Sequence, residues 1–146
     1  MEHTYTVALA GNPNVGKSTV FNRLTGLRQH TGNWPGKTVE RAEGYFSQAG
    51  QPFRLVDLPG TYSLAADSPE EEVAGAFLQS GQADAVIVVV DASCLRRGLI
   101  LALQLRQQTQ RLVLCVNLMD EAARRGITPQ TERLGQLLDV PVVATA

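Results

Sequence analysis

The chain has 146 residues, of which 44% are hydrophobic and 18% charged, so it is not an intrinsically disordered protein and is long enough for one domain with one core. Its formal net charge is −1, from 13 basic and 14 acidic residues, which gives no electrostatic case for binding nucleic acid. The longest apolar run, residues 85–90, is far too short to span a bilayer, and the start lacks the pattern of a signal peptide, so we expect a soluble chain.

Short β-branched segments alternate with helix-like segments along the chain. We predict strands at residues 4–10, 38–47, 51–57, 84–91, 111–117 and 140–146, and helices at residues 17–26, 68–81, 96–108 and 128–139. Ser68 and Thr128 are the expected N-caps of the helices 68–81 and 128–139, and each is followed by a proline. This alternation predicts an α/β fold with a mostly parallel six-stranded sheet, one antiparallel edge strand (38–47) and helices on both faces.

Two features of the chain lie outside this pattern. The stretch TGNWPGKTVE, residues 31–40, should form neither a helix nor a central strand, because Pro35 lacks a backbone donor and glycines favour turns. It holds the only tryptophan, Trp34, and a large ring in a loop suggests that something docks against it. Cys94 and Cys115 are predicted to be buried, reduced thiols of a cytosolic protein rather than a disulfide or a metal site.

The segment GNPNVGKS, residues 11–18, fits the phosphate-loop pattern and lies where that pattern requires, between a predicted strand and a predicted helix. We expect its backbone N–H groups to surround phosphates, Lys17 to reach the β- and γ-phosphates, and Ser18 to bind Mg²⁺. A glycine-rich turn that matches by chance is the alternative. The predicted phosphate-binding residues are Gly11, Asn12, Pro13, Asn14, Val15, Gly16, Lys17, Ser18 and Thr19.

A second motif, DLPG, follows the predicted strand 51–57. Asp57 at the strand end can hold Mg²⁺ through water, and Gly60 can offer its N–H to a γ-phosphate. The alternative is an ordinary turn, since Asp-x-Pro-Gly is good turn chemistry, but the phosphate loop upstream favours the functional interpretation. The residues predicted to contact nucleotide here are Asp57, Leu58, Pro59 and Gly60.

A third motif, NLMD, follows the predicted strand 111–117, at an end where side chains face the ligand crevice. The Asp120 carboxylate can accept hydrogen bonds from N1–H and the 2-amino group of guanine, and adenine offers neither. Such a buried mismatch discriminates by about 10⁴–10⁵. Asn117 would brace the base and the neighbouring loops, and Asp120 could alternatively be a helix cap. The predicted base-binding residues are Asn117, Leu118, Met119 and Asp120.

These motifs resemble those of the small GTPases, whose base-reading motif is Asn-Lys-x-Asp. The set GNPNVGKST, GNWPGKTVE, DLPGTYSL and NLMD is similar to the N-terminal G domain of the bacterial ferrous iron transport protein B family. The resemblance implies a three-layer P-loop GTPase fold over residues 1–146. It also makes 31–40 switch I, where Thr38 binds Mg²⁺ when a γ-phosphate is present. The switch residues implied to contact nucleotide are Gly36, Lys37, Thr38, Val39 and Glu40.

The sequence departs from the family pattern in several places. Leu118 replaces the usual lysine and can cover the base only by apolar contact, so we expect loose binding and fast exchange. Lys37 stands where a small apolar residue is more usual. The motif that supports the guanine O6 should lie at Ala144, Thr145 and Ala146. The chain ends inside it, so we expect a truncated piece of a longer protein that continues into a helical and a membrane domain.

The resemblance also implies activation by K⁺. An asparagine at the position of Asn14 would bind K⁺ together with backbone carbonyls near Gly32 and Trp34, and K⁺ would stabilise transition-state charge where other GTPases use an arginine finger. The alternatives are a turn-forming role for Asn14 and a packing role for Trp34. We therefore expect the catalytic residues to be Lys17, Asn14, Thr38 and Gly60.

Hydrolysis lacks one familiar part. Thr61 and Tyr62 follow Gly60 where many GTPases place a water-orienting glutamine, so we expect slow turnover with water oriented by switch backbone near Gly36 and Thr38. The predicted function is GTP hydrolysis coupled to ferrous iron uptake at the cytoplasmic face of the bacterial inner membrane. Its partners would be GTP and GDP, the chain's own helical and membrane domains and small cytosolic regulators, with no nucleic acid. The alternatives are a ribosome- or RNA-associated GTPase and a weakly hydrolysing nucleotide sensor.

Overall fold

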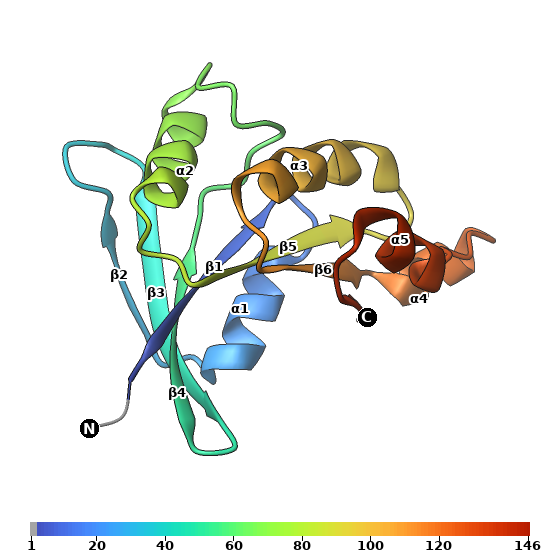
Figure 1. Ribbon diagram of the computed structural model, residues 1–146, viewed down its shortest axis with the longest axis horizontal. Helices are drawn as coiled ribbons and strands as arrows, with labels where there is room; N and C mark the ends of the chain where they lie inside the picture. The colour runs from blue at the N-terminus through green and yellow to red at the C-terminus, as the bar shows by residue number, and fades with distance from the viewer. Residues whose placement is uncertain (1–2) are drawn as a thin grey trace.

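The computed structural model describes residues 3–146 and contains one sheet with the strand order β2-β3-β4-β1-β5-β6-β7 (Figure 1). The strands are β1 (Tyr5–Gly11), β2 (Gln29–Asn33), β3 (Glu40–Gln48), β4 (Gln51–Asp57), β5 (Ala85–Asp91), β6 (Leu112–Asn117) and β7 (Val142–Ala144). The helices are α1 (Lys17–Thr25), α2 (Pro69–Gln79), α3 (Leu95–Gln108), α4 (Met119–Arg124) and α5 (Thr131–Leu138). The predicted α/β fold with a mostly parallel sheet is confirmed.

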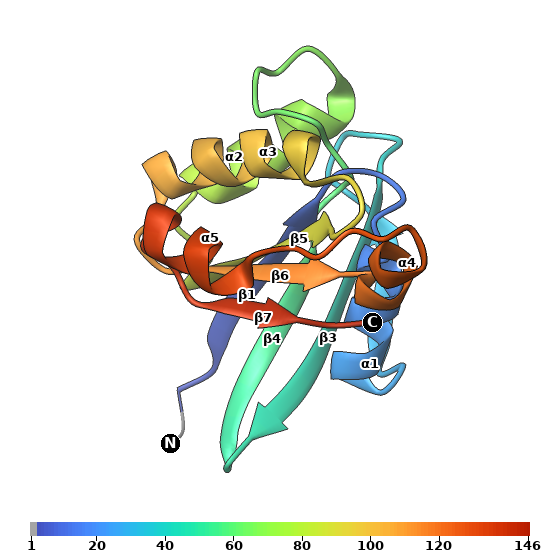
Figure 2. The same ribbon diagram turned by 90° about the vertical axis from the view of Figure 1, so that its right-hand side faces the viewer.

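Alternating side chains of the central strands form two cores, one on each face of the sheet. Ala8 of β1 and Val88 of β5 pack on the side of α2, α3 and α5. Their neighbours Leu9 and Val89 pack on the opposite side with Phe21 of α1. Figure 2 shows α1 apart from the other long helices, across the sheet. Period-two burial on both faces is what strands covered by helices on each side require, and it produces three layers.

The sheet has one strand more than predicted. Strand β2 pairs antiparallel with β3 from Gln29↔Gly44 to Asn33↔Glu40, and all of its residues are exposed. Its sequence, QHTGN, has no apolar alternation, so only backbone pairing reveals it. Because β3 runs antiparallel to both neighbours, it is the one reversed strand as predicted, but it lies second from the edge rather than at it.

The helix starts agree with the predictions in one case and differ in another. Ser68 caps α2, accepting a hydrogen bond from the Glu71 N–H at 3.1 Å, and Pro69 is the first helical residue, as predicted. The prediction that Thr128 caps the last helix is wrong, because α5 begins at Thr131 and its first backbone bond runs from Leu134 N–H to the Gln130 carbonyl.

One smaller prediction needs correction, and one of the alternatives is not observed. Cys115 is buried as expected, but Cys94 is exposed at the start of α3, and both thiols are free. Asp120 is not a cap of α4, because Leu118 holds that position and Asp120 lies in the first turn. Across residues 3–146 no helix combines the length and apolar character needed to cross a membrane.

Candidate nucleotide-binding site

The phosphate loop joins the carboxyl end of β1 to α1, which begins at Lys17. Asn14 and Gly16 have φ values of 66° and 82°, so the loop turns through two left-handed residues before the helix. A Cβ built on Gly16 would lie 2.4 Å from Nδ2 of Asn117. Glycine is therefore required at position 16 both for backbone conformation and for space. The loop presents the N-terminus of α1 to the site, which favours an anion there.

Lys17 is held by the DLPG segment. Its ammonium donates to Oδ1 of Asp57 and, at 2.7 Å, to the Leu58 carbonyl. The side chains of Lys17 and Asp57 are only 11% and 20% exposed. Burial raises the pKa of the Asp57 carboxyl above its ordinary value of 3.8, and the charge and hydrogen bond of Lys17 oppose that rise. The ion pair brings together the two residues predicted to hold phosphate and Mg²⁺.

Two adjoining cavities contain most of the predicted phosphate and Mg²⁺ residues. One, of about 720 Å³, is lined by Thr38 and Asp57, and the other, of about 610 Å³, by Asn14 and Ser18. Lys17 and Gly60 line both. The further predicted residues that line one or the other are Asn12, Pro13, Gly16, Val39, Glu40, Leu58 and Pro59.

The donors in these cavities suit one kind of metal ion. The hydroxyls of Ser18 and Thr38 and the Asp57 carboxylate are hard oxygen ligands, which fit Mg²⁺ shared with a phosphate. Within residues 3–146 no group of three or more His, Cys, Asp or Glu side chains could hold a metal ion. A Mg²⁺ bound between nucleotide and protein needs no such group, because phosphate and water fill most of its coordination positions.

The residues predicted to bind K⁺ lie in different places. Asn14 lines the cavity of the phosphate loop, and Gly32 lines the larger cavity beside switch I. Trp34 lines a third cavity, of about 420 Å³, against α2. In this structure the three residues therefore do not share one cavity.

Trp34 docks against the body of the domain. The side chain is 7% exposed, and its ring meets Phe77 of α2 edge to face at a centroid distance of 5.6 Å. The Arg41 guanidinium of β3 lies 4.5 Å from the indole centroid on the ring face. The indole Nε1 is buried and has no hydrogen-bond partner in the described structure. The ring thus anchors the end of switch I by apolar and cation–π contact alone.

Residues 35–38 of switch I form a tight, exposed turn between β2 and β3. The Trp34 N–H donates to the Val39 carbonyl at 2.9 Å, and the Lys37 N–H donates to the Trp34 carbonyl at 2.9 Å. Gly36 has a φ of 71°, which the turn requires. The Lys37 ammonium lies 3.3 Å from Oε2 of Glu72 on α2, and both side chains are about half exposed. The atypical Lys37 is thus paired with an acid of α2. Because both side chains are exposed to solvent, this ion pair contributes little to stability.

On the base side, the ends of three chain segments are tied together by Asn117. Its side chain is buried, and Nδ2 donates to the Val15 carbonyl of the phosphate loop at 3.1 Å. Its Oδ1 accepts from the Thr145 hydroxyl at 2.8 Å, and the Thr145 carbonyl accepts from the Met119 N–H at 3.0 Å. Cys115 lies 3.4 Å from the same hydroxyl, and burial raises the pKa of its thiol. Asn117 is therefore placed to brace both loops.

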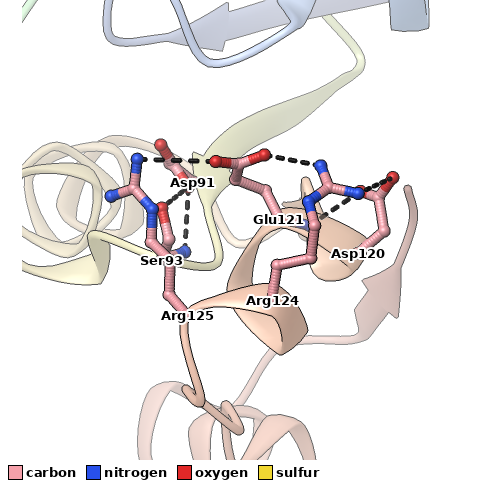
Figure 3. Close-up of polar contacts among 6 residues, drawn as sticks. All are labelled: Asp91, Ser93, Asp120, Glu121, Arg124 and Arg125. Carbon is pink, nitrogen blue, oxygen red and sulfur yellow. Dashed lines mark hydrogen bonds and ion pairs between the residues drawn. The ribbon is translucent and has the colours of Figure 1, made fainter.

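Asp120 lies on an exposed turn at the start of α4 (Figure 3). The backbone reaches it through Leu118, whose φ of 62° is left-handed. Oδ1 of Asp120 accepts from the Glu121 N–H at 2.9 Å, and Oδ2 lies 3.9 Å from Nη1 of Arg124. Arg124 and Arg125 bracket Glu121 at 2.6 Å and 3.4 Å, and the hydrogen bond from Arg124 lowers the pKa of Glu121.

Sequence reasoning missed this arginine pair, although the spacing of acids and arginines by three and four residues in DEAARR was the available signal. It also missed Asp91 at the end of β5, which lies in register with Asn117 and accepts two hydrogen bonds from Ser93 (Figure 3). Thr19 and Ala146, which were predicted to bind nucleotide, line a cavity of about 320 Å³ between α1 and the sheet, together with Asn117 and Thr145.

Comparison with known proteins gives a consistent result. The family model described as "Ferrous iron transport protein B" matches residues 5–146. The Fe(2+) transporter FeoB of Shigella flexneri is 46% identical over 142 residues, which are 94% of this chain but 18% of that protein. The chain therefore spans less than a fifth of the length of this relative.

Two solved structures from T. maritima are close in shape. The G domain of its FeoB iron transporter superposes with a TM-score of 0.92 at 43% identity, covering 98% of this chain and 87% of that one. The cytosolic domain of the same transporter in its GMPPNP form gives 0.93 at 43% identity, covering 97% and 56%. Both likenesses extend over nearly the whole chain.

Proposed function

The chain belongs to the ferrous iron transport protein B family, and from this premise we propose that it is a G domain that binds GTP with Mg²⁺ and hydrolyses it to GDP and phosphate. The observation that carries the proposal is the meeting of Lys17, Asp57, Thr38 and Gly60 around one cavity beside the phosphate loop. These are the parts that phosphoryl transfer from a nucleoside triphosphate requires.

Binding of the nucleotide begins with an exchange of partners by Lys17. Its ammonium would leave the Asp57 carboxylate and the Leu58 carbonyl for the β- and γ-phosphates, and the freed carboxylate would hold Mg²⁺ together with Ser18 and Thr38. Mg²⁺, when bound, neutralises charge that develops on the phosphate oxygens. The Gly60 N–H, beside the same cavity, donates to the γ-phosphate.

The attacking water is oriented by backbone rather than by a side-chain base. Thr61 is 5% exposed, and its N–H and carbonyl are both bonded to the phosphate loop, which supports a structural role. Tyr62 is exposed, with the Arg97 guanidinium 5.1 Å from its ring centroid. With Thr61 and Tyr62 set aside, we propose that backbone groups of switch I near Gly36 and Thr38 orient the attacking water. Turnover should therefore be slow, and K⁺ bound by Asn14 with the carbonyls of Gly32 and Trp34 should raise it.

Base selection rests on Asp120, and Leu118, two residues earlier, stands where the base-reading motif usually has a lysine. We propose that guanine is selected by the Asp120 carboxylate, and that the loss of a charged contact at Leu118 makes nucleotide exchange fast. Within a longer chain, the nucleotide state would regulate ferrous iron uptake through helical and membrane domains, at the cytoplasmic face of the inner membrane. Small cytosolic regulators of uptake are further proposed partners.

A single-turnover assay tests the enzyme activity. Protein in excess over GTP, with Mg²⁺ and K⁺, should release phosphate, and ATP under the same conditions should not react. Lys17→Ala should abolish release. Tight GTP binding without any phosphate release would favour the weakly hydrolysing sensor, and binding of neither nucleotide would overturn the proposal.

A further inference from the structure

Asn12 was predicted to bind nucleotide, but its side chain is committed elsewhere. Its Nδ2 donates to the carbonyl of Thr61 at 2.8 Å, and the Thr61 N–H donates back to the Gly11 carbonyl at 3.0 Å. Asn12 and Thr61 are each only 5% exposed. These two hydrogen bonds join the phosphate loop to the residue that follows DLPG, across 49 positions of sequence.

Residues 58–60 also run alongside the end of β1 and the phosphate loop. The Leu58 N–H donates to the Leu9 carbonyl at 2.9 Å, which extends the pairing of β4 with β1 beyond its last strand residue. Gly60 lies directly over Pro13, because a Cβ at position 60 would stand 3.1 Å from both the Cα and the nitrogen of Pro13. Residues 58–61 are thus fixed at both ends, to β1 at Leu58 and to the phosphate loop at Thr61, and Gly60 lies between the two attachments.

Beyond Thr61 the attachment to the loop ends. Tyr62 is 47% exposed, and the next hydrogen bonds along the chain run from the Ser63 hydroxyl to Oε2 of Glu71 on α2 and from the Leu64 N–H to Oε1 of Gln104 on α3. The segment after Thr61 is therefore held by α2 and α3 rather than by the phosphate loop. Two side chains of the phosphate loop hold residues 58–61 in the described structure, Lys17 through the Leu58 carbonyl and Asn12 through the Thr61 carbonyl. In the proposed nucleotide complex Lys17 turns to the phosphates, so Asn12 is the side chain whose hold on this segment remains.

We infer that Asn12 is a positioning residue, which acts through Thr61 to hold the Gly60 N–H where a γ-phosphate must be recognised. This inference deepens the proposed function and rests on it. Removing the amide would leave the buried Thr61 carbonyl without its donor and free the far end of the segment. Gly60 would then lose its fixed position, while the backbone of residues 11–18 would keep its contacts with the other phosphates.

The expected consequence is selective for the third phosphate. GDP has no γ-phosphate, so its affinity should not depend on the position of Gly60. A GTP analogue such as GMPPNP should lose affinity, by roughly the three- to tenfold that one buried hydrogen bond contributes. Multiple-turnover assays should show a lower kcat, because the same N–H stabilises charge on the transferred phosphoryl group.

The test compares dissociation constants for Mg²⁺–GDP and Mg²⁺–GMPPNP in wild type, Asn12→Ala and Asn12→Asp. Asn12→Asp keeps the volume but places an acceptor against the Thr61 carbonyl, so its selective loss should be at least as large as that of Asn12→Ala. Thr25→Val is the matched control, since the Thr25 hydroxyl is equally buried and donates to the Phe21 carbonyl at 2.9 Å within α1. Thermal unfolding of each variant measures its folding separately.

Loss of GMPPNP affinity with GDP affinity unchanged within about twofold, in both Asn12 variants and not in Thr25→Val, supports the inference. Equal losses for the two nucleotides would overturn it, because Asn12 would then shape the phosphate loop as a whole. Unchanged affinities for both would overturn it as well. If the wild-type protein bound neither nucleotide, the proposed function would fail first, and that result is distinct from either of these.

Discussion

The inner and outer halves of the site are built by different means. The inner half consists of the phosphate loop and residues 57–61, which are joined by buried backbone bonds and by the Lys17–Asp57 pair. The outer half consists of switch I and the base-reading turn at Asp120. Both are largely exposed and are held by the edge-to-face and cation–π contacts of the buried Trp34 ring and by surface ion pairs. The difference suggests that the inner half is in place before the ligand arrives, whereas the outer half is completed by it.

The largest effect should come from the base-reading turn. Asp120→Asn should lower GTP affinity by about 10²-fold or more, because it removes two hydrogen bonds to a charged acceptor, each contributing about 1.5–3 kcal/mol. Part of the loss should return with xanthosine triphosphate, whose 2-oxo group can accept from the new amide. Calorimetric titration measures both affinities.

Glu121→Gln is the matched control for that change, because Glu121 shares Arg124 with Asp120 but lies outside the predicted base contact. It should leave GTP affinity nearly unchanged. Wild-type affinity in Asp120→Asn would show that the outer half does not read the base through this residue.

A smaller effect should follow from loosening switch I. Trp34→Ala should lower the free energy of unfolding by about 3 kcal/mol, because it empties the space against Phe77 and Arg41. Trp34→Phe should cost less than about 1 kcal/mol, since the indole Nε1 has no hydrogen bond to lose and most of the apolar contact remains. Urea denaturation followed by circular dichroism compares them. Equal stability of wild type and Trp34→Ala would mean that the ring does not anchor the outer half.

The smallest effect concerns the buried acid of the inner half. Burial raises the pKa of Asp57, so protonation begins at a higher pH than for an exposed aspartate. The ionised form is needed with Mg²⁺, and Mg²⁺-dependent nucleotide affinity should fall as pH drops through that raised pKa, by up to about tenfold per pH unit. A pH series of dissociation constants measures it. Asp57→Asn should remove this pH dependence. If wild type and Asp57→Asn gave the same pH profile, the account would be contradicted.

Stability should show the opposite trend for the same group. Because the folded state binds the Asp57 proton more tightly than the unfolded state does, this carboxyl favours folding most below its ordinary pKa. That contribution is lost as pH rises through the raised folded-state pKa. Opposite pH trends for stability and for Mg²⁺-dependent binding would together identify Asp57 as their common source.

The sequence predicted best those features that local chemistry determines. The phosphate loop, the capped start of α2 and the buried strand β5 carry their own signals in glycine spacing, a Ser-Pro pair and a β-branched run. A large ring in a loop predicted that Trp34 packs against something. Its partner Phe77 lies 43 positions away, and no local sequence pattern identifies it.

Features made by tertiary contact were missed or misplaced. Strand β2 has no apolar face and exists only through pairing with β3. The bond from Asn12 to Thr61 depends on the parallel pairing of β1 with β4, which places distant residues side by side. Cys94 was predicted buried because it borders apolar segments, yet the turn into α3 leaves it exposed. In each case the outcome depends on contacts or on a chain path that the local sequence does not encode.

The most direct test of the central claim is GTP turnover with Mg²⁺ in K⁺ and in Na⁺ at matched ionic strength, for wild type and Asn14→Ala. We predict turnover that is slow in Na⁺, strongly stimulated by K⁺, and no longer stimulated in the variant. That result would mean that the ligand and a cation draw Asn14 and switch I together to complete the outer half. Equal wild-type turnover in the two salts would contradict this account and leave Trp34 with a packing role alone.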